Sequence, residues 1–126
     1  MDKIVPLLQI VIALGIFNVW CLRLNKPTNY RGGDAKSMEE EFRVYGLSRT
    51  IMFIIGASKI ILAISLIVGL WHPQVARTAA AGMAVLMLAA VGMHIKVHDP
   101  IKKSVPAATM LLMSAAVFLW AAPLPT

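Results

Sequence analysis

The sequence predicts an all-α integral membrane protein: a four-helix bundle with a short amphipathic interfacial helix between its first and second spans. Only 14% of the 126 residues are charged and 59% are hydrophobic, whereas soluble domains average about 25% charged residues. Four long apolar runs also occupy most of the chain. Because short loops use up the remainder, we expect residues 1–126 to form a single membrane domain without a separate soluble part.

The first span is expected at residues 4–22. An α-helix needs about 20 apolar residues to cross the hydrocarbon core of a bilayer. Met1-Asp2-Lys3 carries little positive charge, and no small-residue cleavage pattern follows the run, so we expect a retained span and not a signal peptide. Near its end, Asn18 is suited to a hydrogen bond between helices and Trp20 to the aromatic belt of the membrane interface.

A short amphipathic helix is expected at residues 35–45. Ser37 followed by Glu40 fits a capping box, which satisfies free N–H groups at a helix start. Three apolar side chains share one face at helical spacing: Met38, Phe42 and Tyr45. A helix of this kind is expected to lie in the membrane interface.

The second span, residues 50–70, is apolar except for Lys59 near its middle. A lysine at the bilayer centre costs about 2.5–3.5 kcal/mol on insertion scales, so Lys59 should face the bundle interior or a polar cavity. Gly56, one turn earlier on the same face, would leave room there. Two interpretations stay open: a structural lysine that is hydrogen-bonded or held neutral by desolvation, and a site for an anionic or carbonyl-bearing ligand such as a quinone headgroup.

The third span is expected at residues 75–93 and the fourth at residues 105–122. The third is rich in Ala and Gly, and Ala80 and Ala84 have the spacing that lets helix backbones approach closely. Residues 71–74 are too few for anything but an antiparallel hairpin between spans two and three. Cys21 is the only cysteine, and no metal-ligand spacing is present, so no metal site is predicted.

Charge predicts the orientation. Nine Lys and Arg residues lie in the first and third loops, against two on the opposite side. The positive-inside rule therefore predicts that these loops are cytoplasmic and that both termini are outside; a bacterial cytoplasmic membrane is the default location. The basic rim also suits anionic lipid headgroups. The net charge of +6 needs no nucleic-acid partner, because no nucleic-acid-binding module is present.

His94 and Asp99 are polar candidates at the end of the third span. They could relay protons to a quinone, His94 could ligate the metal of a haem or chlorin, or both could simply close the helix. Arg31 and Arg49 are expected at the interface, where Arg31 could also pack over the bundle mouth. The candidate ligand-binding residues are thus Gly56, Lys59, His94 and Asp99. The candidate lipid or interface residues are Trp20, Arg31, Phe42, Tyr45 and Arg49.

Three segments together resemble one family. They are RGGDAKSMEEEFRVYGL (31–47), GASK (56–59) and MLAAVGMHIKVHDPIKK (87–103), and the chain resembles the DoxX-like family of small four-helix membrane proteins. It departs from the family where Lys59 replaces an acidic residue of many relatives and His98 replaces a glycine. The resemblance implies the fold and membership of membrane oxidoreductase complexes, including thiosulfate:quinone oxidoreductase-like systems, or a role as assembly chaperone or cargo receptor.

Three functions follow as hypotheses. The first is an accessory subunit of a membrane redox or electron-transfer complex, without complete catalytic machinery of its own and in contact with other membrane subunits. The second is a quinone- or lipid-binding oxidoreductase component with its pocket near Lys59. The third is an assembly chaperone or receptor for other membrane proteins. No Ser-His-Asp arrangement or phosphate loop points to a self-sufficient enzyme.

Overall fold

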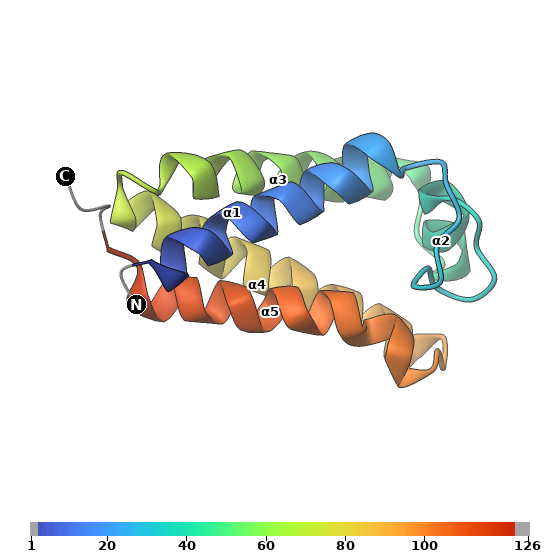
Figure 1. Ribbon diagram of the computed structural model, residues 1–126. Coiled ribbons are helices and arrows are strands. Elements are labelled where there is room, and N and C mark those ends of the chain that lie inside the picture. Colours follow the sequence, from blue (N-terminus) through green and yellow to red (C-terminus); the bar gives the residue numbers. More distant parts are fainter. Residues whose placement is uncertain (1–2, 123–126) are drawn as a thin grey trace.

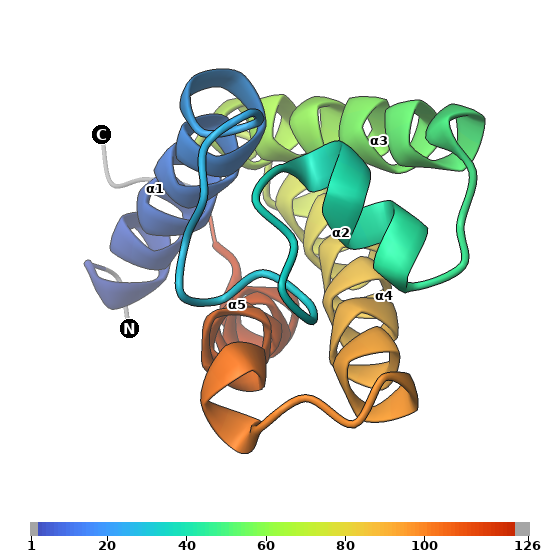
Figure 2. The same ribbon diagram turned by 90° about the vertical axis from the view of Figure 1, so that its right-hand side faces the viewer.

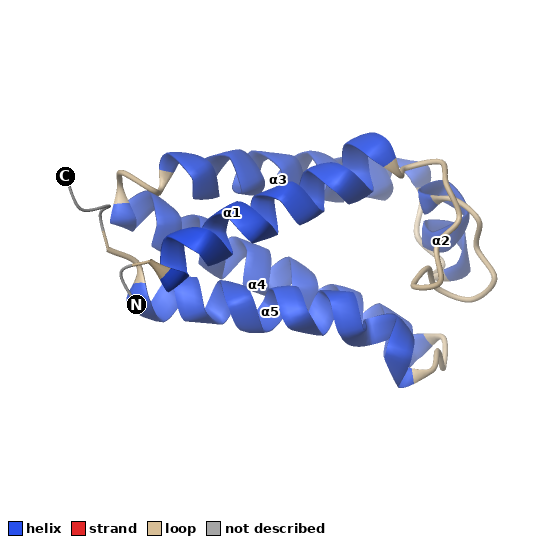
Figure 3. Cartoon of the chain, viewed as in Figure 1, coloured by secondary structure: helices blue, strands red, loops and turns tan. Residues whose placement is uncertain are grey.

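The chain is helical throughout the part described by the computed structural model, residues 3–122. Residues 1–2 and 123–126, which include the chain's two ends, lie outside it. The helices are α1 (Ile4–Phe17), the π-helix η1 (Asn18–Leu22), α2 (Met38–Val44), α3 (Arg49–Val68), α4 (Pro73–Lys96) and α5 (Ile101–Trp120). Figure 3 shows these helices joined by loops, the longest of them residues 23–37, with no strand between residues 3 and 122. The all-α prediction is confirmed.

Four segments are long and apolar enough to cross a membrane: Ile4–Leu22, Arg49–Val68, Pro73–Lys96 and Ile101–Trp120. The predicted four-span bundle is confirmed. The last helix begins before the expected residue 105, because Pro100 acts as its N-cap with an extended backbone and Ile101 follows as the first helical residue. Pro106 therefore lies inside α5, where it lines the cavity described below.

The four long helices form a bundle in which each has two main neighbours. Helix α1 packs against α3 and α5, and α4 packs against the same two helices. Figure 1 shows α2 and its preceding loop at the same end of the bundle as the α4–α5 turn, with the α3–α4 turn at the other end. We call the first of these, residues 23–48 and 97–100, the loop end. The predicted pairing of the first and third loops at one end of the molecule is therefore confirmed.

Small side chains hold α3 and α4 together. Ala76, Ala79 and Ala80 of α4 are at most 2% exposed. A Cβ atom added to Gly69, which follows α3, would lie 2.7 Å from the Ala76 Cα atom. This spacing leaves no room for a side chain, so the approach of the two helices depends on Gly and Ala, as expected for helix packing in membranes.

One buried polar tie joins α1 to α3, and nothing in the sequence analysis singled it out. The Gln9 side chain is buried, and its Nε2 donates to the Leu66 carbonyl at 2.9 Å. This carbonyl is free because the Leu70 N–H bonds to Ile67 instead as α3 ends. Gln9 thus satisfies one of the carbonyl groups that every helix leaves unpaired at its C-terminus.

Helix α2 crosses the loop end of the bundle, as Figure 2 shows. The predicted cap is confirmed: Ser37 Oγ accepts the Glu40 N–H at 3.2 Å, and the Glu40 carboxylate accepts the Lys36 N–H at 3.2 Å. The predicted apolar face is confirmed as well, and it is buried against the bundle: Met38, Phe42 and Tyr45. Helix α2 therefore closes one end of the bundle.

Candidate functional site

A cavity of about 730 Å³ lies between the spans beneath α2 and its preceding loop. Pockets that hold small molecules and cofactors are typically about 300–1,000 Å³, mostly apolar, with a few polar groups that fix orientation. The wall formed by the spans is apolar and includes Ile16, Val19, Ile55, Leu86, Met87 and Met110. The polar lining comes from the loop end and from α3, α4 and α5: Arg31, Glu41, Tyr45, Lys59, His94 and Lys103.

His94 and Asp99 form a buried pair at the edge of this cavity. His94 Nδ1 lies 2.7 Å from Asp99 Oδ2, and the two side chains are 7% and 4% exposed. Between them the chain reverses at His98, whose φ of 59° is in the left-handed region that favours glycine. A histidine here carries a backbone strain that glycine would avoid.

The Asp99 carboxylate is held ionised. Burial alone would raise its pKa, but hydrogen bonds from His94 and from the Gly33 N–H, together with the charge of Lys103, bring the pKa below its usual value. An ionised carboxylate at Nδ1 keeps a proton on that nitrogen. The other ring nitrogen, Nε2, is then the one that can exchange a proton with another group.

Tyr45 connects this pair to a second ion pair. Its hydroxyl donates to Glu41 Oε1 at 2.7 Å and lies 3.4 Å from both ring nitrogens of His94. Arg31 Nη1 pairs with Glu41 Oε2 at 3.2 Å. Burial and the negative charge of Glu41 raise the pKa of Tyr45, so Tyr45 stays a neutral phenol. The groups form one continuous network from Arg31 to Asp99.

The same network fastens the loop before α2 over the cavity. Arg31 donates to the carbonyl groups of Arg23 and Lys26, the latter at 2.9 Å. The Gly33 N–H donates to Asp99 Oδ1 at 3.0 Å, and Lys103 donates to the Gly33 carbonyl. Gly33 has a φ of +55°, a conformation that glycine adopts without strain. The loop is therefore tied to the α4–α5 turn through Asp99 and to the first turn of α5 through Lys103.

Lys59 enters the cavity from α3. Its Nζ lies 5.5 Å from the ring centroid of Trp20, within the range of a cation–π contact. Within residues 3–122 no side chain or carbonyl makes a hydrogen bond or ion pair with this Nζ. Lys59 therefore has donor capacity that the described part of the protein does not use.

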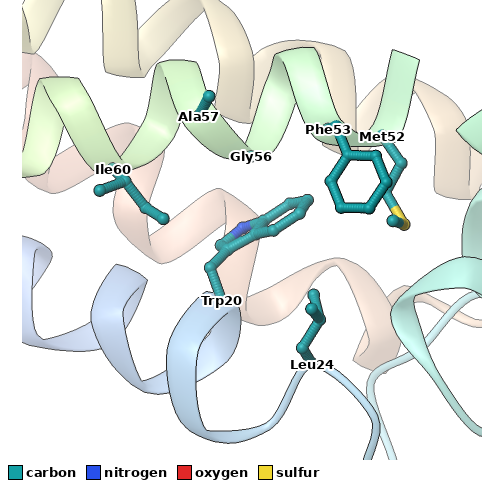
Figure 4. A pocket seen from close by; sticks show the side chains of 7 residues that line it. All are labelled: Trp20, Leu24, Met52, Phe53, Gly56, Ala57 and Ile60. Atoms are coloured by element: carbon teal, nitrogen blue, oxygen red, sulfur yellow. The ribbon is translucent and has the colours of Figure 1, made fainter. Parts of the chain in front are cut away.

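Gly56 serves a different contact. Figure 4 shows the Trp20 ring against the Gly56 position on α3, and a Cβ atom at Gly56 would lie only 2.4 Å from Trp20 Cζ3. Trp20 belongs to η1, where the Arg23 N–H bonds to the Asn18 carbonyl five residues earlier at 2.9 Å. A smaller hollow of about 260 Å³ lies beside this contact, lined also by Leu24, Met52, Phe53, Ala57 and Ile60.

The structure thus places the residues singled out in the sequence at three locations. Those at the main cavity or directly behind it are Trp20, Arg31, Phe42, Tyr45, Lys59, His94 and Asp99. Gly56 lines the smaller hollow, and the indole of Trp20 fills the space that Gly56 leaves. Arg49 is exposed, with its guanidinium 5.4 Å over the Phe53 ring. The other four candidate interface residues are at most 7% exposed and point into the protein.

Sequence reasoning missed Glu41 and Lys103. Both had a local signal, because Glu41 precedes Tyr45 by four residues and Lys103 follows Asp99 by four, and side chains at this spacing share a helix face. Gly33 had no such signal, since its partner Asp99 is distant in sequence. No cluster of three or more His, Cys, Asp or Glu side chains suited to a metal ion occurs in residues 3–122.

Comparison with known proteins supports one assignment. The sequence model of the DoxX-like family matches residues 31–117, well over half of the chain. The match includes α2, α3 and α4, and so all of the network from Arg31 to Lys103. No curated protein and no solved structure matches the chain.

Proposed function

This chain belongs to the DoxX-like family, and on that premise we propose that it is the quinone-binding accessory subunit of a redox complex in a bacterial cytoplasmic membrane. In this proposal the chain binds and orients the quinone headgroup and exchanges protons with it. Partner subunits exchange the electrons. The protein itself is small and membrane-spanning, with lipid around its four apolar helices.

One observation carries the proposal: Lys59 from α3 and His94 from α4 line the same cavity, together with Tyr45. A quinone has a flat apolar ring with carbonyl oxygens and a long apolar tail. The ring suits a wall of Ile, Leu and Met side chains, its oxygens suit the Lys59 ammonium and His94 Nε2, and the tail suits the surrounding bilayer.

The proton chemistry follows from the His94–Asp99 pair. Asp99 holds the proton on Nδ1, so neutral His94 accepts a proton at Nε2 from a bound quinol hydroxyl, and protonated His94 returns one to a quinone oxygen. Asp99 stabilises the imidazolium and orients the ring without touching the ligand. Tyr45, kept neutral, lies within reach of both His94 nitrogens and limits the orientations of the ring.

Binding is tested with decylubiquinone and purified protein in phosphatidylcholine nanodiscs, with quenching of tryptophan fluorescence as the signal because Trp20 lines the cavity. We expect Lys59→Met and His94→Ala each to raise the Kd by about tenfold or more, the value of a lost hydrogen bond to a charged or polar group. Lys102→Met is the matched control, because Lys102 is exposed in the first turn of α5 and does not line the cavity. Equal affinity in all four proteins would refute a quinone site here.

The complex and its orientation have separate tests. Gentle detergent purification from native membranes should recover the chain in stable association with redox subunits, and a chain that always runs alone would contradict the proposal. For orientation, Asp34→Cys in a Cys21→Ser background places a single exposed thiol at the loop end. An impermeant maleimide should label it in inside-out vesicles and not in right-side-out vesicles.

A further inference from the structure

The cationic side chains around the main cavity differ in how well their charges are paired with oxygen atoms of the protein. Arg31 is paired with Glu41, and Lys103 is bound to the Gly33 carbonyl and lies 3.9 Å from Asp99 Oδ1. Glu41, the acidic side chain in the cavity lining, already accepts hydrogen bonds from Arg31, Tyr45 and the Gly32 N–H. Lys59 is the remaining deep cation, and the described residues offer it only the face of Trp20.

A lysine in this position is unstable unless something compensates it. The amine sits in the middle of a membrane-spanning helix, where water is scarce and a charge is expensive. A contact with an indole ring recovers part of that cost. A ligand oxygen with a negative charge would recover more than a neutral one, because it adds direct attraction between opposite charges, poorly screened at this depth, to the charge-assisted hydrogen bond.

We propose that the main cavity selects ligands whose headgroup carries an ionised oxygen on a lipophilic body, and that the Lys59 ammonium binds this oxygen. The inference rests on the proposed quinone function and narrows it: the preferred ligand is an acidic hydroxyquinone, or the anionic reduced form of a quinone, and not the neutral quinone. A fatty carboxylate presents the same chemistry from another source.

The other groups at the cavity favour the same selection. Arg23 stands exposed at the rim and adds positive charge without a carboxylate partner among the described residues. Glu41 is held away from the ligand by its three donors. The apolar wall of Ile55, Met87 and Met110 accepts the uncharged ring. The cavity thus combines an excess of positive charge with an apolar face.

The test compares two ligands of nearly equal size in phosphatidylcholine nanodiscs. One is 2-hydroxy-1,4-naphthoquinone, which is an anion at pH 7, and the other is its neutral 2-methoxy analogue. We expect the hydroxy compound to bind wild-type protein about tenfold to hundredfold more tightly. This comparison needs no variant, so a folding defect cannot obscure it. Lys59→Met should abolish the preference, Lys59→Arg should retain most of it, and Lys102→Met should leave it unchanged.

The outcomes separate the two proposals. Equal binding of both naphthoquinones by wild-type protein would overturn the charge selection and leave the quinone function standing. Failure of every quinone to bind would overturn both. If dodecanoate displaces the hydroxy compound from wild-type protein but not from Lys59→Met, the anion site is supported. The native ligand of that site is then assigned as a lipid carboxylate. A preference that persists unchanged in Lys59→Met would overturn the role of Lys59.

Discussion

Replacing Gly56 by alanine tests how α1 and α3 are joined beside the site. The new Cβ would lie 2.4 and 2.6 Å from two Trp20 ring carbons, about 1 Å inside the 3.4 Å at which ordinary contact begins. The indole is a rigid plane held by η1, so it must move as a unit. Overpacking of this kind costs about 1–3 kcal/mol of unfolding free energy.

Gly92→Ala is the matched control for this substitution. Gly92 also lies in a membrane-spanning helix, but a Cβ added there meets no atom within 4 Å. Both variants gain the same helix propensity, about 0.5–1 kcal/mol for Gly to Ala, so the difference between them isolates the clash. We expect Gly56→Ala to be less stable than Gly92→Ala by about 1–3 kcal/mol, measured by unfolding in mixed dodecylmaltoside–SDS micelles and far-UV circular dichroism.

A double-mutant cycle identifies the clashing partner. In a Trp20→Leu background the penalty of Gly56→Ala should largely disappear, because the smaller side chain leaves space for the Cβ atom. Equal stability of the two glycine variants, or a penalty that persists without Trp20, would show that Trp20 does not pack on Gly56. The orientation of Trp20 toward Lys59 would then have to be reconsidered as well.

Three further predictions concern the polar network. The folded-state pKa of Asp99 is lowered. The ionised carboxylate therefore stabilises the protein above the unfolded pKa of about 3.9, and this stabilisation is lost as the pH falls below that value. Asp99→Asn should destabilise the protein at pH 7 and remove the acid-dependent loss of stability measured by urea or SDS titration. The raised pKa of Tyr45 predicts that its contribution to stability is complete below about pH 10 and declines above that pH. In Tyr30→Phe, which leaves Tyr45 as the sole tyrosine, phenolate absorbance near 295 nm should appear only when the protein unfolds. Phenolate absorbance in the folded protein near pH 10 would contradict the burial of Tyr45. His98→Gly should stabilise the protein by about 0.5–1 kcal/mol, because relief of the left-handed backbone, about 1–2 kcal/mol, exceeds the greater conformational entropy that glycine loses on folding. A loss of stability would mean that the His98 side chain makes a contact more important than the strain.

The chain's hydrophobic pattern was sufficient to predict the four spans, though not the π-helical end of the first or the early start of the fourth. Four runs of apolar residues have to be helices, because a helix satisfies its own backbone hydrogen bonds within lipid. The capping box at Ser37 and Glu40 depends on residues three apart, so the sequence predicts it directly. The cost of a charge in lipid marks Lys59 in the same way. All these features depend on neighbours along the chain.

The composition of the site depended on contacts between distant segments. Helical spacing predicted that Gly56 and Lys59 share a face, yet Trp20 from η1 fills the space at Gly56, and Lys59 instead shares a cavity with His94 of α4. Tyr45 and Arg31 are amphipathic side chains that suit either an interface or an interior. Their hydrogen-bond partners Glu41 and His94, the latter held by Asp99, stabilise both side chains in the interior, because buried polar groups are stable only when they are hydrogen-bonded.

The sequence by itself therefore determined that this is a four-span DoxX-like membrane protein with costly polar residues in and beside its spans. Only the tertiary structure decided which of those residues meet. The physical reason is that hydrophobicity and capping act over a few residues, whereas a cavity is the space left after helices far apart in the chain have packed. The presence of Lys59 and His94 at one cavity belongs to the second kind of information.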